Sequence, residues 1–117
     1  MPTILLVEDD DGIRFAIATV LELSGYRVIE AIEGQQALNI LASGTNIDLV
    51  ITDNQMDGMD GIEFIRQFRL IGYTIEIIML TARHGLICDA DYILRKPIDA
   101  KCFLAAVEFA LSKRKAA

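Results

Sequence analysis

The feature that most constrains the fold is a series of five short strand-like segments, separated by segments with helical spacing. Four are mainly apolar runs, Ile4–Val7, Leu49–Ile51, Ile75–Leu80 and Tyr92–Leu94, and the fifth, Tyr26–Ala31, alternates weakly between apolar and polar residues. Short runs rich in β-branched residues are typical of strands covered on both faces. Strands that alternate with helices require right-handed crossovers, which give a parallel sheet with helices on both sides. The sequence therefore predicts an α/β protein with a doubly wound, five-stranded parallel sheet.

Between the runs, apolar residues recur at the spacing of helices with one buried face. The predicted inner faces are Ile13, Ile17, Val20 and Leu21; Ala37, Leu38 and Leu41; Ile62, Ile65 and Phe68; and Phe103, Leu104, Val107 and Leu111. Gly25 and Gly44 are natural stops for the first two helices, and we expect Asp99 to cap the last.

Length and composition limit the class of protein. The 117 residues, 53% of them hydrophobic, suffice for a proper core, so we interpret residues 1–117 as a single domain. No apolar run is long enough to span a membrane and no signal-peptide pattern opens the chain, which favours the cytoplasm. The net charge of −6 argues against direct nucleic-acid binding. Cys88 and Cys102 lie in no metal-ligand spacing and are interpreted as reduced thiols.

Four of the five predicted strands end on polar residues. These residues are Glu8 and Asp9, Asp53, Thr81, and Lys96. The carboxyl ends of parallel strands lie along one edge of the sheet, where open α/β sheets place their chemistry. We therefore expect three carboxylates, one hydroxyl and one ammonium around a shared pocket, with Asp53 at its centre.

Carboxylates within about 4–6 Å of one another repel, and a hard divalent cation resolves that repulsion. Mg²⁺ suits best, because it accepts a few carboxylates and keeps several waters. With Lys96 and Thr81 beside it, such a site fits a phosphoryl group, and the Asp53 carboxylate can act as a nucleophile that forms an acyl phosphate. Each residue alone has another interpretation, as a helix cap, a turn residue or a solvated charge. The coincidence of all of them along one edge favours the shared site.

The motifs that carry these residues resemble those of the receiver domain of two-component response regulators. They are Leu6-Val7-Glu8-Asp9-Asp10, Thr52-Asp53 with Met56 and Asp60-Gly61, Leu80-Thr81-Ala82, and Lys96-Pro97. The resemblance covers essentially the whole chain. It implies a flavodoxin-like sheet of five strands in the order 2-1-3-4-5, surrounded by five helices, with a cis Lys96-Pro97 bond.

The resemblance also implies a role for each site residue. Asp53 would accept a phosphoryl group from a histidine kinase or a phosphotransfer protein. The metal, Mg²⁺ or Mn²⁺, would be bound by Asp9, Asp53 and the Gln55 carbonyl, and by Glu8 through a water. The phosphoryl group would be contacted by Thr81, Lys96 and the N–H groups of Asn54 and Ala82. Gln55 and Arg83 match the positions that tune autodephosphorylation.

Three departures from the family pattern concern the output of the signal. Asp57 replaces the usual proline, which is expected to loosen the turn. Thr81 and Lys96 are only 15 positions apart, so the fourth helix, within Arg83–Asp91, is expected to be shortened or disordered. Ile93 stands where the family carries its switch aromatic, and the neighbouring Tyr92 points to the other sheet face. We hypothesise that phosphorylation orders Arg83–Asp91 instead.

The resulting interpretation is a response regulator that is not an enzyme on external substrates and catalyses only its own phosphoryl transfer and autodephosphorylation. It would bind an output protein that the sequence does not identify, without contacting nucleic acid or a membrane. The alternative is a pseudo-receiver, a protein-interaction domain that is never phosphorylated. A phosphate-ester hydrolase would need a second aspartate two positions after Asp53, where Gln55 stands.

Overall fold

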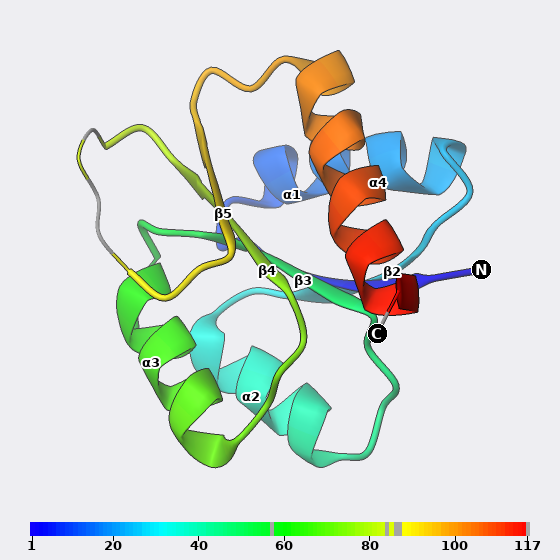
Figure 1. Ribbon diagram of the computed structural model, residues 1–117. Helices are drawn as coiled ribbons and strands as arrows, with labels where there is room; N and C mark the ends of the chain where they lie inside the picture. Colours follow the sequence, from blue (N-terminus) through cyan, green and yellow to red (C-terminus); the bar gives the residue numbers. More distant parts are fainter. Residues whose placement is uncertain (57, 84, 86–87, 117) are drawn as a thin grey trace.

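Five parallel strands form one sheet in the order β2-β1-β3-β4-β5, as predicted (Figure 1). The strands are β1 (Thr3–Val7), β2 (Arg27–Ala31), β3 (Leu49–Asp53), β4 (Ile77–Thr81) and β5 (Tyr92–Arg95). The structure is a computed structural model that describes residues 1–56, 58–83, 85 and 88–116, without the side chains of 114–116. The three central strands are buried along their whole length, whereas β2 and β5 lie at the edges and are only partly buried.

The described residues form four helices, which cover both faces of the sheet (Figure 1). They are α1 (Asp11–Leu23), α2 (Gly34–Ala42), α3 (Gly61–Ile71) and α4 (Ala100–Ala116). The core beneath α2 and α3 includes Leu38, Phe64 and Phe68. The core beneath α1 and α4 includes Leu21 and Val107. Alternate residues of the central strands contribute to the two cores, because successive side chains of a strand point to opposite faces.

Aspartates fix the starts of three helices by accepting a hydrogen bond from a backbone N–H of the first turn. Asp10 accepts from Ile13 at 2.9 Å, Asp60 from Glu63 at 2.8 Å, and Asp99 from Cys102 at 3.0 Å. The predicted cap at Asp99 is thus confirmed. Since only residues 8–10 separate β1 from α1, the Asp10 cap also fixes the loop that follows β1.

The expected fourth helix, between β4 and β5, is absent from the described part of that connection. Residues 82, 83, 85 and 88–91 are not helical, so the described chain has four helices where the family resemblance implied five. The physical reason is the length of the connection, which leaves too few residues for a stable helix. Residues 84, 86 and 87 lie outside the described residues, so the hypothesis that Arg83–Asp91 is disordered is not tested over its whole length.

Arg69, near the end of α3, holds the last part of the β4–β5 connection. Its Nη2 donates to Asp91 Oδ2 at 2.7 Å, and its Nη1 donates to the carbonyl of Ile75 at 3.0 Å. Asp91 Oδ2 also accepts from the N–H of Ile77 at 2.7 Å. Asp91, the last residue of the connection, is therefore fixed to the start of β4, at the end of the sheet opposite to the carboxylates.

The predicted helix faces are largely confirmed, with one exception in α1. Leu21 is buried and Ile17 and Val20 are half-buried, but Ile13 is 41% exposed. Ile13 lies in the first turn, where helical spacing gives the direction of a side chain but not whether the sheet extends beneath it. Within the described ranges, no helix is both long and apolar enough for a membrane crossing.

Candidate phosphoryl and metal site

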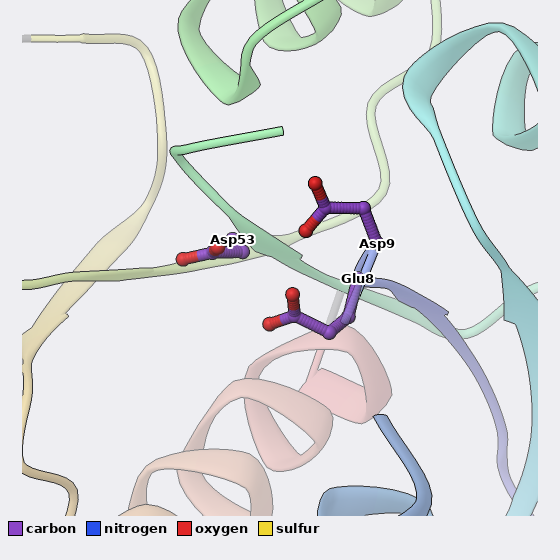
Figure 2. Close-up of side chains that lie close together, drawn as sticks. All are labelled: Glu8, Asp9 and Asp53. Carbon is purple, nitrogen blue, oxygen red and sulfur yellow. The ribbon is translucent and has the colours of Figure 1, made fainter. Parts of the chain in front are cut away.

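The carboxylates of Glu8, Asp9 and Asp53 meet at the carboxyl ends of β1 and β3 (Figure 2). Each offers an oxygen, and these oxygens all lie within 4.8 Å of one another. The two strands are direct neighbours, with Val7 in register with Thr52, so the residues that follow them emerge side by side. Sequence reasoning correctly predicted that these three side chains would gather at one edge.

Glu8 is the most buried of the three carboxylates, with 1% of its surface exposed. The pKa of Glu8 is raised from 4.5 to about 7, mainly by burial and in part by the nearby charge of Asp53, against the lowering effect of a hydrogen bond from the N–H of Asp10. Oε2 of Glu8 accepts that bond at 3.1 Å. Oε1 is buried and has no hydrogen-bond partner among the described residues.

Lys96 and Thr81 lie on the other side of Asp53, as predicted. The Nζ of Lys96 forms an ion pair with Oδ1 of Asp53 at 3.0 Å, and the backbone N–H of Lys96 donates to the Thr81 carbonyl at 2.8 Å. The Lys96–Pro97 peptide bond is cis, as the resemblance implied. Thr81 is buried, and its Oγ1 accepts from the N–H of Arg83 at 3.0 Å. Because the hydroxyl accepts in that bond, its own proton is what a bound oxygen would receive.

A hollow of about 500 Å³ opens beside the acidic cluster. Its lining residues come from the loops after three strands: Asp9, Asn54, Gln55, Met56, Asp60 and Arg83. Gln55, Ala82 and Arg83 are exposed at or near this edge. Asn54 is buried, and its N–H donates to the Leu80 carbonyl at 3.2 Å, so a phosphoryl group would have to share or replace that bond. The hollow offers space for a phosphoryl group.

The donor set fits a hard divalent cation. Carboxylate oxygens are the ligands that Mg²⁺ prefers, and the unpartnered, buried Oε1 of Glu8 is an oxygen that a cation or its bound water would satisfy. A dication would also offset the burial of the Glu8 carboxylate and its repulsion by Asp53, which together raise the pKa of Glu8.

The switch position differs from the usual aromatic in its surroundings as well as in its identity. Ile93 pairs with Met79 and is 38% exposed. Tyr92 packs on the other face, in the core beneath α1 and α4, with its ring 6.0 Å from that of Phe109. The predicted separation of Tyr92 and Ile93 between the two faces is thus confirmed. Asp57, where the family usually carries a proline, lies outside the described residues.

Sequence reasoning missed two residues that contact the site's backbone. Arg14 donates to the carbonyl of Glu8 at 2.9 Å. Gly61 lies so close to the end of β3 that an added Cβ would be 2.5 Å from the carbonyl oxygen of Asp53. The only sequence signals were an arginine three residues after Asp11 and the Asp60-Gly61 pair of the family motif, and neither reveals a contact with a distant backbone.

Comparisons with known proteins agree with this geometry. The family described as response regulator receiver domain matches residues 4–108. The transcriptional regulatory protein AfsQ1 of Streptomyces coelicolor is 35% identical over 97% of this chain, and the response regulator MprA of Mycolicibacterium vanbaalenii is 36% identical over 94%. The chain spans about half the length of these curated relatives, 52% and 50% respectively.

Among solved structures, the response regulator TrrA of Thermotoga maritima, in complex with Mg²⁺ and BeF, superimposes with a TM-score of 0.87 at 32% identity. The match covers 95% of this chain and 100% of TrrA. The family match, the strand order and the acidic edge all lead to one assignment: the chain belongs to the response regulator receiver domain family.

Proposed function

We propose that residues 1–117 form a single receiver domain in which Asp53 accepts a phosphoryl group from a histidine kinase or a phosphotransfer protein. The phosphorylated form would then change the binding of an output protein. The observation that carries this proposal is the meeting of three carboxylates within 4.8 Å, with Lys96 3.0 Å from Asp53 on its other side. Together these groups provide a nucleophile, a cation site and a positive charge for phosphoryl oxygens.

Asp53 would act as the nucleophile. Lys96 holds Oδ1 at 3.0 Å and fixes the direction of the carboxylate. A carboxylate oxygen attacks phosphorus, a phosphorus–oxygen bond forms, and the bond from phosphorus to the donor nitrogen breaks, with its electron pair leaving on the donor. The product is an aspartyl phosphate, which water can later hydrolyse. This chemistry acts on the domain itself and turns over no external substrate.

The other site residues would hold the transferred group. Lys96 would neutralise a phosphoryl oxygen, the Thr81 hydroxyl would donate to another, and the N–H groups of Asn54 and Ala82 would add further hydrogen bonds. Gln55 and Arg83, at the rim of the hollow, would tune the access of water. Asp9, Asp53 and the Gln55 carbonyl would hold Mg²⁺, with Glu8 acting through a water. When bound, Mg²⁺ supplies positive charge to the phosphoryl oxygens.

The test is incubation with acetyl phosphate and Mg²⁺, followed by measurement of the intact mass. Wild-type protein should gain one phosphoryl group, and Asp53→Asn should gain none. Asp60→Asn is the matched control, because Asp60 lines the same hollow and asparagine can still accept the capping bond from the N–H of Glu63. An adduct that survives in Asp53→Asn would contradict the proposal.

One observation favours the pseudo-receiver as the second candidate. The described part of the β4–β5 connection contains no helix, so the surface that this helix provides in the family differs here. A pseudo-receiver would show no adduct in the wild type, with acetyl phosphate or with any phosphorylated donor protein. The same mass measurement therefore separates the two candidates.

A further inference from the structure

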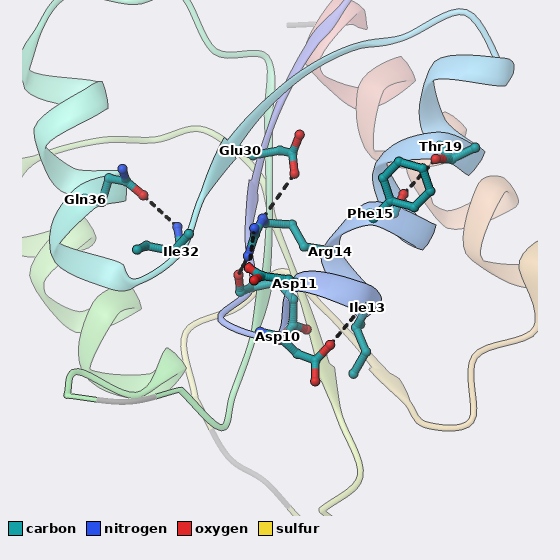
Figure 3. A network of polar contacts seen from close by, with 10 residues as sticks. Asp10, Asp11, Ile13, Arg14, Phe15, Thr19, Glu30, Ile32 and Gln36 are labelled. Atoms are coloured by element: carbon teal, nitrogen blue, oxygen red, sulfur yellow. Dashed lines mark hydrogen bonds and ion pairs between the residues drawn. The ribbon is translucent and has the colours of Figure 1, made fainter.

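Arg14, in the first turn of α1, connects three elements next to the acidic cluster (Figure 3). Its Nη1 donates to the backbone carbonyl of Glu8 at 2.9 Å, its Nε to Glu30 Oε1 at 3.1 Å, and its Nη2 to Asp11 Oδ1 at 2.6 Å. Only 14% of its side chain is exposed. Because a guanidinium presents its donors in a rigid planar fork, three simultaneous contacts fix both its position and its orientation.

The carbonyl that Arg14 contacts belongs to the peptide unit between Glu8 and Asp9. The pairing of β1 with its neighbours ends at Val7, although the N–H of Glu8 still donates to the Ala31 carbonyl at 3.0 Å. Beyond that bond the chain turns into α1, and Arg14 supplies the contact to the carbonyl there. The orientation of this peptide plane limits ψ of Glu8 and φ of Asp9, and so the directions in which their side chains leave the backbone. Arg14 therefore restrains the relative placement of these two side chains.

The charge of Arg14 does not explain its presence beside this site. A positive charge close to a cation site opposes binding of the cation. Here the carboxylates of Asp11 and Glu30 neutralise the guanidinium at 2.6 Å and 3.1 Å. What remains is the geometric contribution, a fixed donor that ties α1 and β2 to the backbone of the Glu8–Asp9 turn.

We propose that Arg14 is a positioning residue for the Mg²⁺ site, holding the Glu8–Asp9 turn so that both carboxylates meet Asp53. The inference rests on the proposed function, since it concerns the same cation site. It differs from a simple electrostatic role in the sign of its effect. Removal of one positive charge by itself tightens Mg²⁺ binding, whereas loss of the fixed turn weakens it.

The test measures the Mg²⁺ affinity of the unphosphorylated protein by titration calorimetry, with the melting temperature in EDTA as a check of folding. Arg14→Met removes the guanidinium, with its N–H donors and its charge, while keeping much of the length of the side chain. Arg14→Lys keeps the charge but loses the fork, and is the milder variant if Arg14→Met does not fold. Arg66→Met is the matched control, because Arg66 also pairs with an acidic residue three positions earlier, Glu63 at 2.6 Å, but is 59% exposed and lies on α3.

We expect Arg14→Met and Arg14→Lys to weaken Mg²⁺ binding by about 10-fold or more, as is typical when a group that orients a metal ligand is lost. Arg66→Met should bind Mg²⁺ like the wild type. Unchanged or tighter binding by both Arg14 variants would overturn the inference and leave the proposed function intact. A wild-type protein that binds no Mg²⁺ would instead overturn the proposed function, and this inference with it.

Discussion

Gly61, the first residue of α3, is the position where a single added methyl group should disturb the site most. An added Cβ would lie 2.5 Å from the Asp53 carbonyl oxygen and 2.8 Å from the Cα of Asn54. The first of these distances falls about 0.9 Å short of the 3.4 Å at which ordinary contact begins. Both neighbours are backbone atoms, and the N–H of Gly61 donates to the Asn54 carbonyl at 2.8 Å. Neither α3 nor the end of β3 can therefore move without the other.

Gly61→Ala should lower the free energy of unfolding by about 1–3 kcal/mol, the usual cost of overpacking a tightly packed site. It should slow phosphorylation of Asp53 by about 10²-fold, since a displacement near 1 Å of a reacting group has that effect. Denaturant unfolding measures the first quantity, and the rate of adduct formation with acetyl phosphate, followed by intact mass, measures the second.

Gly34→Ala is the matched control, because Gly34 is the first residue of α2 and is also buried. Its nearest contact for an added Cβ is Met59 Sδ at 2.9 Å, which belongs to a flexible side chain that can move aside. Both changes place alanine at the start of a helix, so the effect of helix propensity is the same in each. If Gly61→Ala proved as stable and as reactive as Gly34→Ala, the close approach of α3 to Asp53 would contribute nothing to stability or to phosphorylation.

Two further predictions concern pH and the β4–β5 connection. In metal-free protein, Glu8 has a pKa of about 7 when folded against 4.5 when unfolded, so the folded chain binds more protons between these pH values. The free energy of unfolding should therefore fall as pH rises through this window, by up to about 3 kcal/mol at about 1.4 kcal/mol per pKa unit. Glu8→Gln should remove that fall. If the free energy of unfolding of the wild type instead rose with pH through this window, relative to that of Glu8→Gln, the raised pKa of Glu8 would not be its cause. Beryllofluoride with Mg²⁺ should slow amide exchange in residues 83–91 of the wild type but not of Asp53→Asn. The proposed link is Thr81, whose hydroxyl would contact the bound group and whose Oγ1 accepts from the N–H of Arg83 at 3.0 Å. Unchanged exchange would exclude an ordering switch.

The positions of the carboxylates could be predicted from the sequence because they depend on a simple regularity. An apolar run marks a strand, and the first polar residues after it stand at the edge of the sheet. Glu8 and Thr81 are the first polar residues after their runs, and Asp53 and Lys96 are the second, after Thr52 and Arg95. Parallel pairing then brings residues from distant parts of the chain together without any further information.

The contacts that support the site could not be predicted in this way. Arg14 reaches Glu30, 16 residues away, and Arg69 reaches Asp91, 22 residues away. Charged residues on helices and strands are predicted to be exposed to solvent unless the relative placement of the elements is known. The close approach of Gly61 to Asp53 likewise depends on the exact depth of a helix against a sheet, which periodicity does not determine.

The proposed function requires that the carboxylate of Asp53, and no other, becomes phosphorylated. Borohydride reduces an aspartyl phosphate to homoserine, so treatment of the phosphorylated protein followed by peptide mass mapping locates the modified residue directly. We expect homoserine at position 53 and aspartate at position 9, although both carboxylates lie in the same cluster. Reduction at position 9 or position 8, or no reduced residue in a protein that carries the added mass, would contradict it.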